Sequence, residues 1–155
     1  MLSQPIAKQL EAHLDEVSFV YRSLPHALAR VEVITPTKGW RSFFHRQADI
    51  LRAHQSELRG IVAAWGRRLR PCACEEVTEK LNEVRYALAA RPGTPLLERT
   101  VHKVLSELRA MVIKDLEDAE RIAKKLEELD LSAQLHNLLK SEQELARAQE
   151  EPFRK

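Results

Sequence analysis

Apolar residues recur at every third or fourth position through most of the chain, which is the spacing of one buried face along an α-helix. Prolines, glycines and short polar segments interrupt this pattern and mark the ends of the helices. The pattern predicts five helices, within one domain that spans residues 1–155. Pro25 should either kink the first helix or restart it. The predicted helices span about 4–30, 38–69, 75–90, 96–128 and 132–151.

The connections between these helices predict how they pack. Short connections near residues 33–39 and 129–132 favour two antiparallel hairpins, one at each end of the sequence. The clearest turn ends at Thr94, which is expected to cap the next helix, with Pro95 in the first helical position. A long segment with its own helix separates the hairpins, and one such crossover is typical of ferritin-like bundles. The predicted fold is therefore all-α: a ferritin-like four-helix bundle of two antiparallel hairpins with a helical crossover.

Composition narrows the class of protein but not its function. Apolar residues make up 44% and charged residues 31%, which is typical of a soluble globular protein. Four glycines and 5% aromatic residues argue against a β-sandwich, a β-barrel or a phosphate-loop enzyme. A net charge of +2 argues against a strongly basic nucleic-acid-binding protein. Without a long apolar run or a signal-peptide pattern, we expect a cytoplasmic protein that does not enter a membrane.

Each of the four long predicted helices carries one ionisable residue within its apolar stripe or at its edge. These residues are His13, His54, Asp115 and Glu142. Counted from the predicted turns at about 1.5 Å per residue, His13 should be level with His54, and Asp115 roughly level with Glu142. Two imidazoles and two carboxylates near the middle of a bundle form a plausible ligand set for iron, manganese or zinc.

A metal-free interpretation of the same four residues stands beside this one. A buried carboxylate that pairs with a histidine or an arginine is satisfied without a metal. The geometry would distinguish the two interpretations. Ligand atoms within roughly 2.0–2.3 Å of one point indicate a metal. Direct hydrogen bonds of about 2.8 Å between imidazole and carboxylate indicate a polar core.

With this helix plan, the chain resembles the YciF-like branch of the ferritin-like superfamily. The similarity is distributed over Arg22 to Ala29, Phe43 to His45, Cys72 to Cys74, Leu116 to Leu126, and Leu135 to Glu142. The resemblance implies a ferritin-like bundle, often dimeric, from bacteria and linked to stress responses. Members of the superfamily commonly hold two irons with glutamates and Glu-x-x-His pairs.

The sequence departs from that di-iron pattern at most ligand positions. The second predicted helix lacks Glu-x-x-His, and Val17 occupies the acid position of the first helix. Arg109 and Val112 stand where the resemblance leads us to expect glutamates, and Glu142 alone falls on an expected ligand position. The resemblance therefore supports the fold and weakens an oxidase or ferroxidase function, which leaves open whether the protein is an enzyme.

Two smaller features are interpreted as structural. Cys72 and Cys74 are too close in sequence to staple the fold, and two reduced thiols are expected there. The basic segment from Gly66 to Arg70 suits the end of a helix.

Three functions remain as hypotheses. The first is a stress-response protein with a degenerate metal site in the core. The second is a metal-free structural or interaction protein that forms a homodimer, and the third, weaker one is a DNA-associated bundle.

Overall fold

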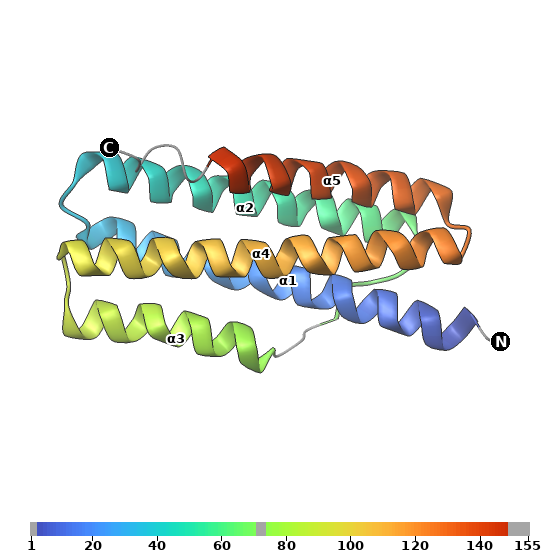
Figure 1. The fold of residues 1–155 in the computed structure, drawn as a ribbon, viewed down its shortest axis with the longest axis horizontal. Coiled ribbons are helices and arrows are strands. Elements are labelled where there is room, and N and C mark those ends of the chain that lie inside the picture. Colours follow the sequence, from blue (N-terminus) through green and yellow to red (C-terminus); the bar gives the residue numbers. More distant parts are fainter. Residues whose placement is uncertain (1–2, 71–73, 149–155) are drawn as a thin grey trace.

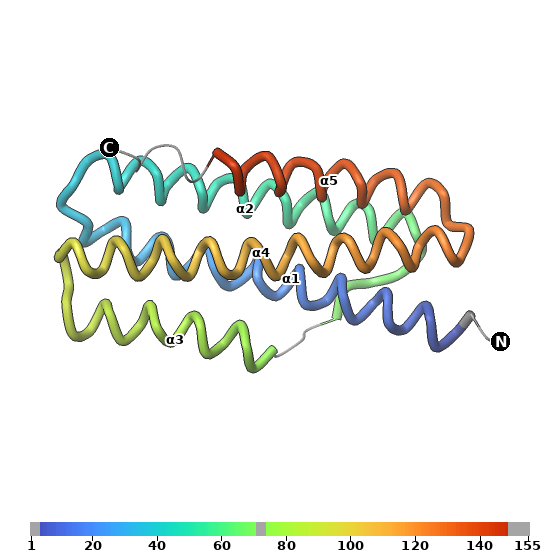
Figure 2. The backbone as a smooth tube through the Cα atoms, viewed as in Figure 1, coloured from blue at the N-terminus to red at the C-terminus, as the bar shows by residue number. Residues whose placement is uncertain are grey.

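The computed structural model describes residues 3–70 and 74–148, and these residues form five α-helices and no strand. The helices are α1 (Ser3–Ile34), α2 (Lys38–Ala64), α3 (Glu75–Ala90), α4 (Pro95–Lys125) and α5 (Leu129–Ala148). Figures 1 and 2 show four long helices arranged as a bundle, with α3 lying outside it against α1 and α4. The predicted all-α bundle is confirmed.

The crossover helix α3 carries the chain from the end of α2 back to the end of the bundle where α4 begins. Figure 1 shows that α2 and α4 run the same way along the bundle, so the chain must return to the starting end before α4 begins. α3 makes this return, and its buried Val77, Leu81 and Val84 lie on the face expected for packing against a bundle. At that end a Cβ atom at Gly93 would lie 3.5 Å from the Ile34 carbonyl oxygen, so the two turns are neighbours. Two hairpins with a helical crossover are therefore confirmed.

The first helix is longer than predicted. It continues past Pro25 without a restart and ends at Ile34 rather than near residue 30. Pro36 sets this end because a residue that precedes proline disfavours the helical conformation. Thr35 completes the end: its hydroxyl donates to the Val31 carbonyl oxygen at 2.7 Å.

The predicted ends of the second and fourth helices were too late. α2 ends at Ala64 instead of residue 69 because Gly66 adopts a positive φ of 81°. The backbone N–H of Arg67 then donates to the Val62 carbonyl, which closes a Schellman motif. α4 ends at Lys125 instead of residue 128, and α5 begins at Leu129 instead of residue 132.

The turn between α4 and α5 has the same geometry without a glycine. Glu127 adopts a φ of 60°, and the N–H of Glu128 donates to the Ala123 carbonyl. This left-handed residue reverses the chain so tightly that α5 begins almost at once. The predicted end of the last helix, near residue 151, lies outside the described residues.

The core is built from the apolar stripes that the sequence predicts. Thr94 and Pro95 begin α4 as expected, and the Thr94 hydroxyl accepts a hydrogen bond from the Leu97 N–H. Leucines from α1, α2, α4 and α5 fill the interior around Tyr21 and Phe44. Among the largest fully buried side chains are Leu10, Leu14, Leu24, Leu28, Leu58, Leu105, Leu108, Leu116 and Leu135.

Candidate functional site

A carboxylate lies at the centre of the bundle. Glu142 on α5 is only 1% exposed, and its two oxygens are contacted from the three other long helices. Its Oε1 accepts a hydrogen bond from the Tyr21 hydroxyl at 2.8 Å and lies 2.5 Å from Nδ1 of His54. Its Oε2 accepts a hydrogen bond from Nε of Arg109 at 2.9 Å. Three groups that can donate hydrogen bonds therefore surround this carboxylate.

Arg109 supplies the positive charge that a buried carboxylate requires. Its side chain is 2% exposed, and its Nη1 also donates to Oε1 of Gln47 at 2.8 Å. We call Tyr21, Gln47, His54, Arg109 and Glu142 the core network. The edge of the Tyr21 ring meets the His54 ring, with centroids 5.8 Å apart. Each of the four long helices contributes at least one member, so the network fixes how all four pack.

The surroundings of Glu142 and Tyr21 shift the pKa values of both groups. Burial alone would raise the pKa of the Glu142 carboxyl, but the hydrogen bond from His54 and the Arg109 charge outweigh burial and lower it. Burial and the neighbouring Glu142 charge hold the pKa of Tyr21 well above its usual value. Near neutral pH, Glu142 is therefore ionised and Tyr21 keeps the proton that it donates.

A second histidine–carboxylate pair lies nearer the surface. Nδ1 of His13 is 2.8 Å from Oδ1 of Asp115, and the two side chains are 30% and 12% exposed. The hydrogen bond to Asp115 raises the pKa of His13, against the opposing effect of burial. Glu16 lies one turn further along α1, where burial raises the pKa of its carboxyl. This pair connects α1 to α4 without a member of the core network.

The four predicted site residues therefore form two pairs and not one cluster. His13 precedes Tyr21 by eight residues in α1, which places the pairs roughly 12 Å apart along the bundle. The His54 ring meets the Tyr21 ring and not that of His13, so His13 and His54 are not level as predicted. Within residues 3–70 and 74–148, no three His, Cys, Asp or Glu side chains are placed to hold a metal ion together. Metal binding by this quartet stays a prediction.

The core network does not fit the two-metal centre that the resemblance implies. A di-metal centre needs several carboxylates around its cations. Here the Arg109 guanidinium occupies one Glu142 oxygen, and His54 and Tyr21 contact the other. Val17, at the position of a further acid, is a fully buried apolar residue. Arginine thus provides the positive charge that a metal would otherwise supply.

Sequence reasoning placed all four candidate residues on inner faces or their edges, but it missed the partners of Glu142. The spacing of apolar residues gives no sign that Tyr21 donates a hydrogen bond, and Arg109 enters the sequence argument only as a departure from an expected glutamate. A signal for Arg109 did exist: it follows buried Leu105 by four positions and precedes buried Val112 by three. That spacing places a charged side chain on a buried face, where it needs an opposite charge.

The two smaller sequence features have structural roles in the described residues. The Cys74 thiol contacts Oε1 of Glu16 at 3.5 Å, and burial raises its pKa, so it stays protonated; Cys72 lies outside the described residues. In the basic segment, Arg67 forms an ion pair with Glu11 at 2.8 Å, and the Arg70 N–H donates to Asp15. These contacts attach the end of α2 to α1.

The comparisons with known proteins agree with this architecture. The crystal structure of the Escherichia coli stress protein YciF matches with a TM-score of 0.81 and 12% identity, over 93% of this chain and 91% of that one. The chain has a YciF-like fold. YcfI, a proposed structural protein from Rhodopseudomonas palustris, matches with a TM-score of 0.82 and 11% identity, over 94% and 93% of the two chains. No protein-family model and no curated protein matches the sequence.

These identities are low, so the comparisons establish the fold alone. They confirm the YciF-like architecture that the sequence predicts and leave the chemistry to this chain's own residues. In the part of the chain that the structure describes, no helix is apolar and long enough to span a membrane.

Proposed function

We propose that this protein is a metal-independent helical bundle with a structural role in a stress response. The observation that carries the proposal is the contact between Arg109 and Glu142. Glu142 is the most deeply buried of the four candidate residues, and the Arg109 guanidinium balances its negative charge. A core that carries its own counter-charge is stable without a cofactor. The names of the two structural neighbours, a stress protein and a proposed structural protein, support this role.

The competing function is the predicted metal-binding protein, with iron, manganese or zinc held by His13, His54, Asp115 and Glu142. The separation of these residues into two pairs weighs against a single site for all four. Homodimerisation, the other part of the metal-free hypothesis, belongs to the proposal as an expectation. It requires a separate measurement of mass in solution.

Thermal unfolding with and without metal tests the proposal. The untagged protein is reconstituted separately with Fe²⁺, Mn²⁺ and Zn²⁺, and melting temperature and metal content are measured. We expect less than about a tenth of a metal per chain and no metal-dependent shift, because a ligand stabilises a fold only if it binds the folded state. His54→Ala and Glu142→Ala should each lower the melting temperature, and the decrease in each variant should be the same whether or not metal is added.

One variant serves as a positive control for metal binding. Arg109→Glu removes the guanidinium and places a second carboxylate beside Glu142 and His54, which completes a set of three metal ligands. This variant should be less stable than wild type and should recover stability when Zn²⁺ is added. A metal-dependent rise in the wild-type melting temperature that His54→Ala abolishes would overturn the proposal and favour the metal-binding function.

A further inference from the structure

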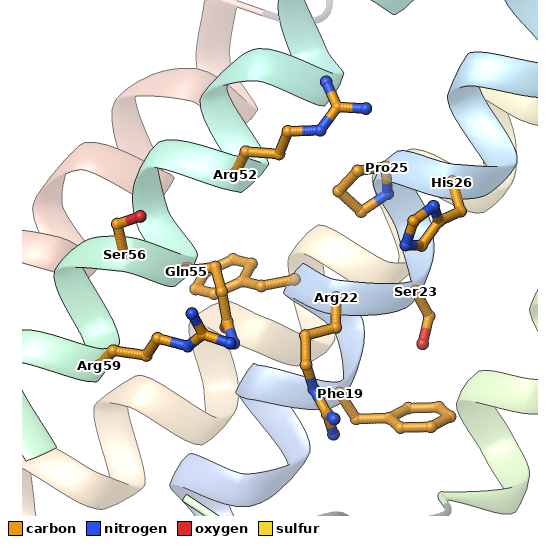
Figure 3. Close-up of a pocket in the computed structure, with 10 residues that line it drawn as sticks. Phe19, Arg22, Ser23, Pro25, His26, Arg52, Gln55, Ser56 and Arg59 are labelled. Atoms are coloured by element: carbon orange, nitrogen blue, oxygen red, sulfur yellow. The ribbon is translucent and has the colours of Figure 1, made fainter.

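A groove between α1 and α2 gathers positive charge on one face of the bundle (Figure 3). Its volume is about 560 Å³, which lies within the range of small-molecule sites. We call it the arginine groove. The residues that matter for its chemistry are Phe19, Arg22, His26, Arg52, Gln55 and Arg59. No aspartate or glutamate lines it.

Two of the arginines in the arginine groove, Arg22 and Arg59, form no ion pair in the described residues, although the Asp15 carboxylate lies close enough to Arg22 to interact with its charge. Arg52 pairs with Asp49 at 3.2 Å, but none of the ion pairs in the described part of the chain includes Arg22 or Arg59. Figure 3 shows Arg59 extending from α2 across the view toward Gln55, Arg22 extending downward from α1, and Arg52 extending upward. Two guanidinium groups from neighbouring helices therefore line one space without a carboxylate.

The overall charge conceals this concentration of arginines. Residues 1–70 carry 11 Lys and Arg against six Asp and Glu, whereas residues 71–155 carry 14 against 17. A net charge of +2 is thus the sum of a basic first hairpin and an acidic remainder. Such an asymmetry attracts anions to one side of a protein.

The floor of the arginine groove is fixed by hydrogen bonds to the interior. Gln55 donates through Nε2 to the Ser18 hydroxyl at 3.1 Å, and Tyr21 is bound to Glu142. Buried Pro25, which has no N–H, forms part of the wall. Because the floor is anchored to the core, the groove is formed before any ligand arrives, and binding need not order it.

We propose that the arginine groove binds a small organic diphosphate, with Arg22 and Arg59 as its phosphate ligands. Arginine suits this role because its planar guanidinium donates two parallel hydrogen bonds to a phosphate and remains charged. Arg22 and Arg59 line the same groove, so each can bind one phosphate of a diphosphate, and the Phe19 ring gives an apolar surface for the organic part. The proposal uses no metal and takes no phosphate ligand from the core network, of which only Tyr21 reaches the floor of the groove, so it goes beyond the proposed function.

Calorimetric titration of the full chain with inorganic pyrophosphate, without divalent metal and at low ionic strength, tests the site. We expect saturable binding at one site per chain, stronger than that of inorganic phosphate. Arg22→Gln and Arg59→Gln should each weaken binding by about tenfold or more, because each removes a charge-assisted hydrogen bond. Both side chains are exposed, so circular dichroism should show unchanged helix content.

Arg99→Gln is the matched control, since it removes the same charge from an exposed position on α4 outside the arginine groove. Unchanged affinity in this variant supports the proposal. An equal loss in all three variants overturns it, because binding would then follow net charge alone. A lack of pyrophosphate binding by wild type also overturns it.

A short oligothymidylate distinguishes a free diphosphate from the backbone of a nucleic-acid strand. If the oligonucleotide binds through Arg22 and Arg59 while pyrophosphate does not, the small-ligand proposal is wrong and the groove is a nucleic-acid site. If pyrophosphate binds and the oligonucleotide binds more weakly, the proposal is supported.

Discussion

Replacing Arg109 with methionine tests the ionic core most directly. The substitution keeps a long side chain but removes the Arg109 guanidinium from Glu142, a carboxylate that is 1% exposed. Breaking a buried ion pair from one side costs about 3–5 kcal/mol of unfolding free energy. Because His54 and Tyr21 still contact Glu142, we expect a loss near the lower end, about 3 kcal/mol. That is a large part of the roughly 5–15 kcal/mol that stabilises a typical domain.

The measurement is urea unfolding at pH 7, followed by circular dichroism, for Arg109→Met, Glu142→Leu and the double variant. The double variant should be more stable than Arg109→Met, since it removes the buried negative charge together with its partner. The wild type is measured alongside the three variants. If the unfolding free energy falls with urea concentration at the same slope in all four proteins, their unfolding reactions are comparable.

The pH dependence gives a second readout of the same pair. In the wild type the pKa of Glu142 is lowered, so its stabilising contribution is present above the unfolded pKa and is lost as pH falls through the folded one. Without Arg109, burial is opposed by His54 but no longer by the guanidinium, so the pKa of Glu142 should rise. The variant then gains stability relative to wild type as pH falls from 7 toward 5. A loss below about 1 kcal/mol at pH 7, or a deficit that does not change with pH, would refute the ionic-core interpretation.

Three further predictions concern the turns, the second pair and the assembly. Glu127→Gly should raise the unfolding free energy by about 0.5–1 kcal/mol by relieving a left-handed residue, and Gly66→Ala should lower it by a similar amount; a lower melting temperature for Glu127→Gly would contradict this. His13→Gln should lower the unfolding free energy more at pH 6 than at pH 8.5. The reason is that the pKa of His13 is raised in the folded state, so its stabilising contribution is present below the pKa of the unfolded state and is lost as pH rises through that of the folded state. As His13 is 30% exposed, we expect that loss to stay below about 1 kcal/mol, measured by chemical denaturation at both pH values. Analytical ultracentrifugation should give the mass of a dimer of the 17.8 kDa chain, and a monomer at all concentrations would refute the predicted self-association.

The sequence by itself determined the helices and their inner faces. The bounds of α3 agree with the prediction, and Thr94 and Pro95 begin α4 as expected, because capping and helix-breaking are local properties of residue type. The inward positions of His54, Asp115 and Glu142 also followed from periodicity. The lengths of the connections, two short and one long, were enough to predict two hairpins and a crossover.

Only the tertiary structure decided which side chains meet. Periodicity gives the angle of a residue around its helix, but its height relative to another helix depends on where every turn begins and ends. Counting residues from the first turn predicts that His13 and His54 are level, but packing places His54 beside Tyr21, which lies eight residues, or about 12 Å, from His13 along α1. The partner of Glu142 was undetermined for the same reason. The arginine groove likewise exists only where α1 and α2 lie together, because net charge records how many charges a chain has and not where folding places them.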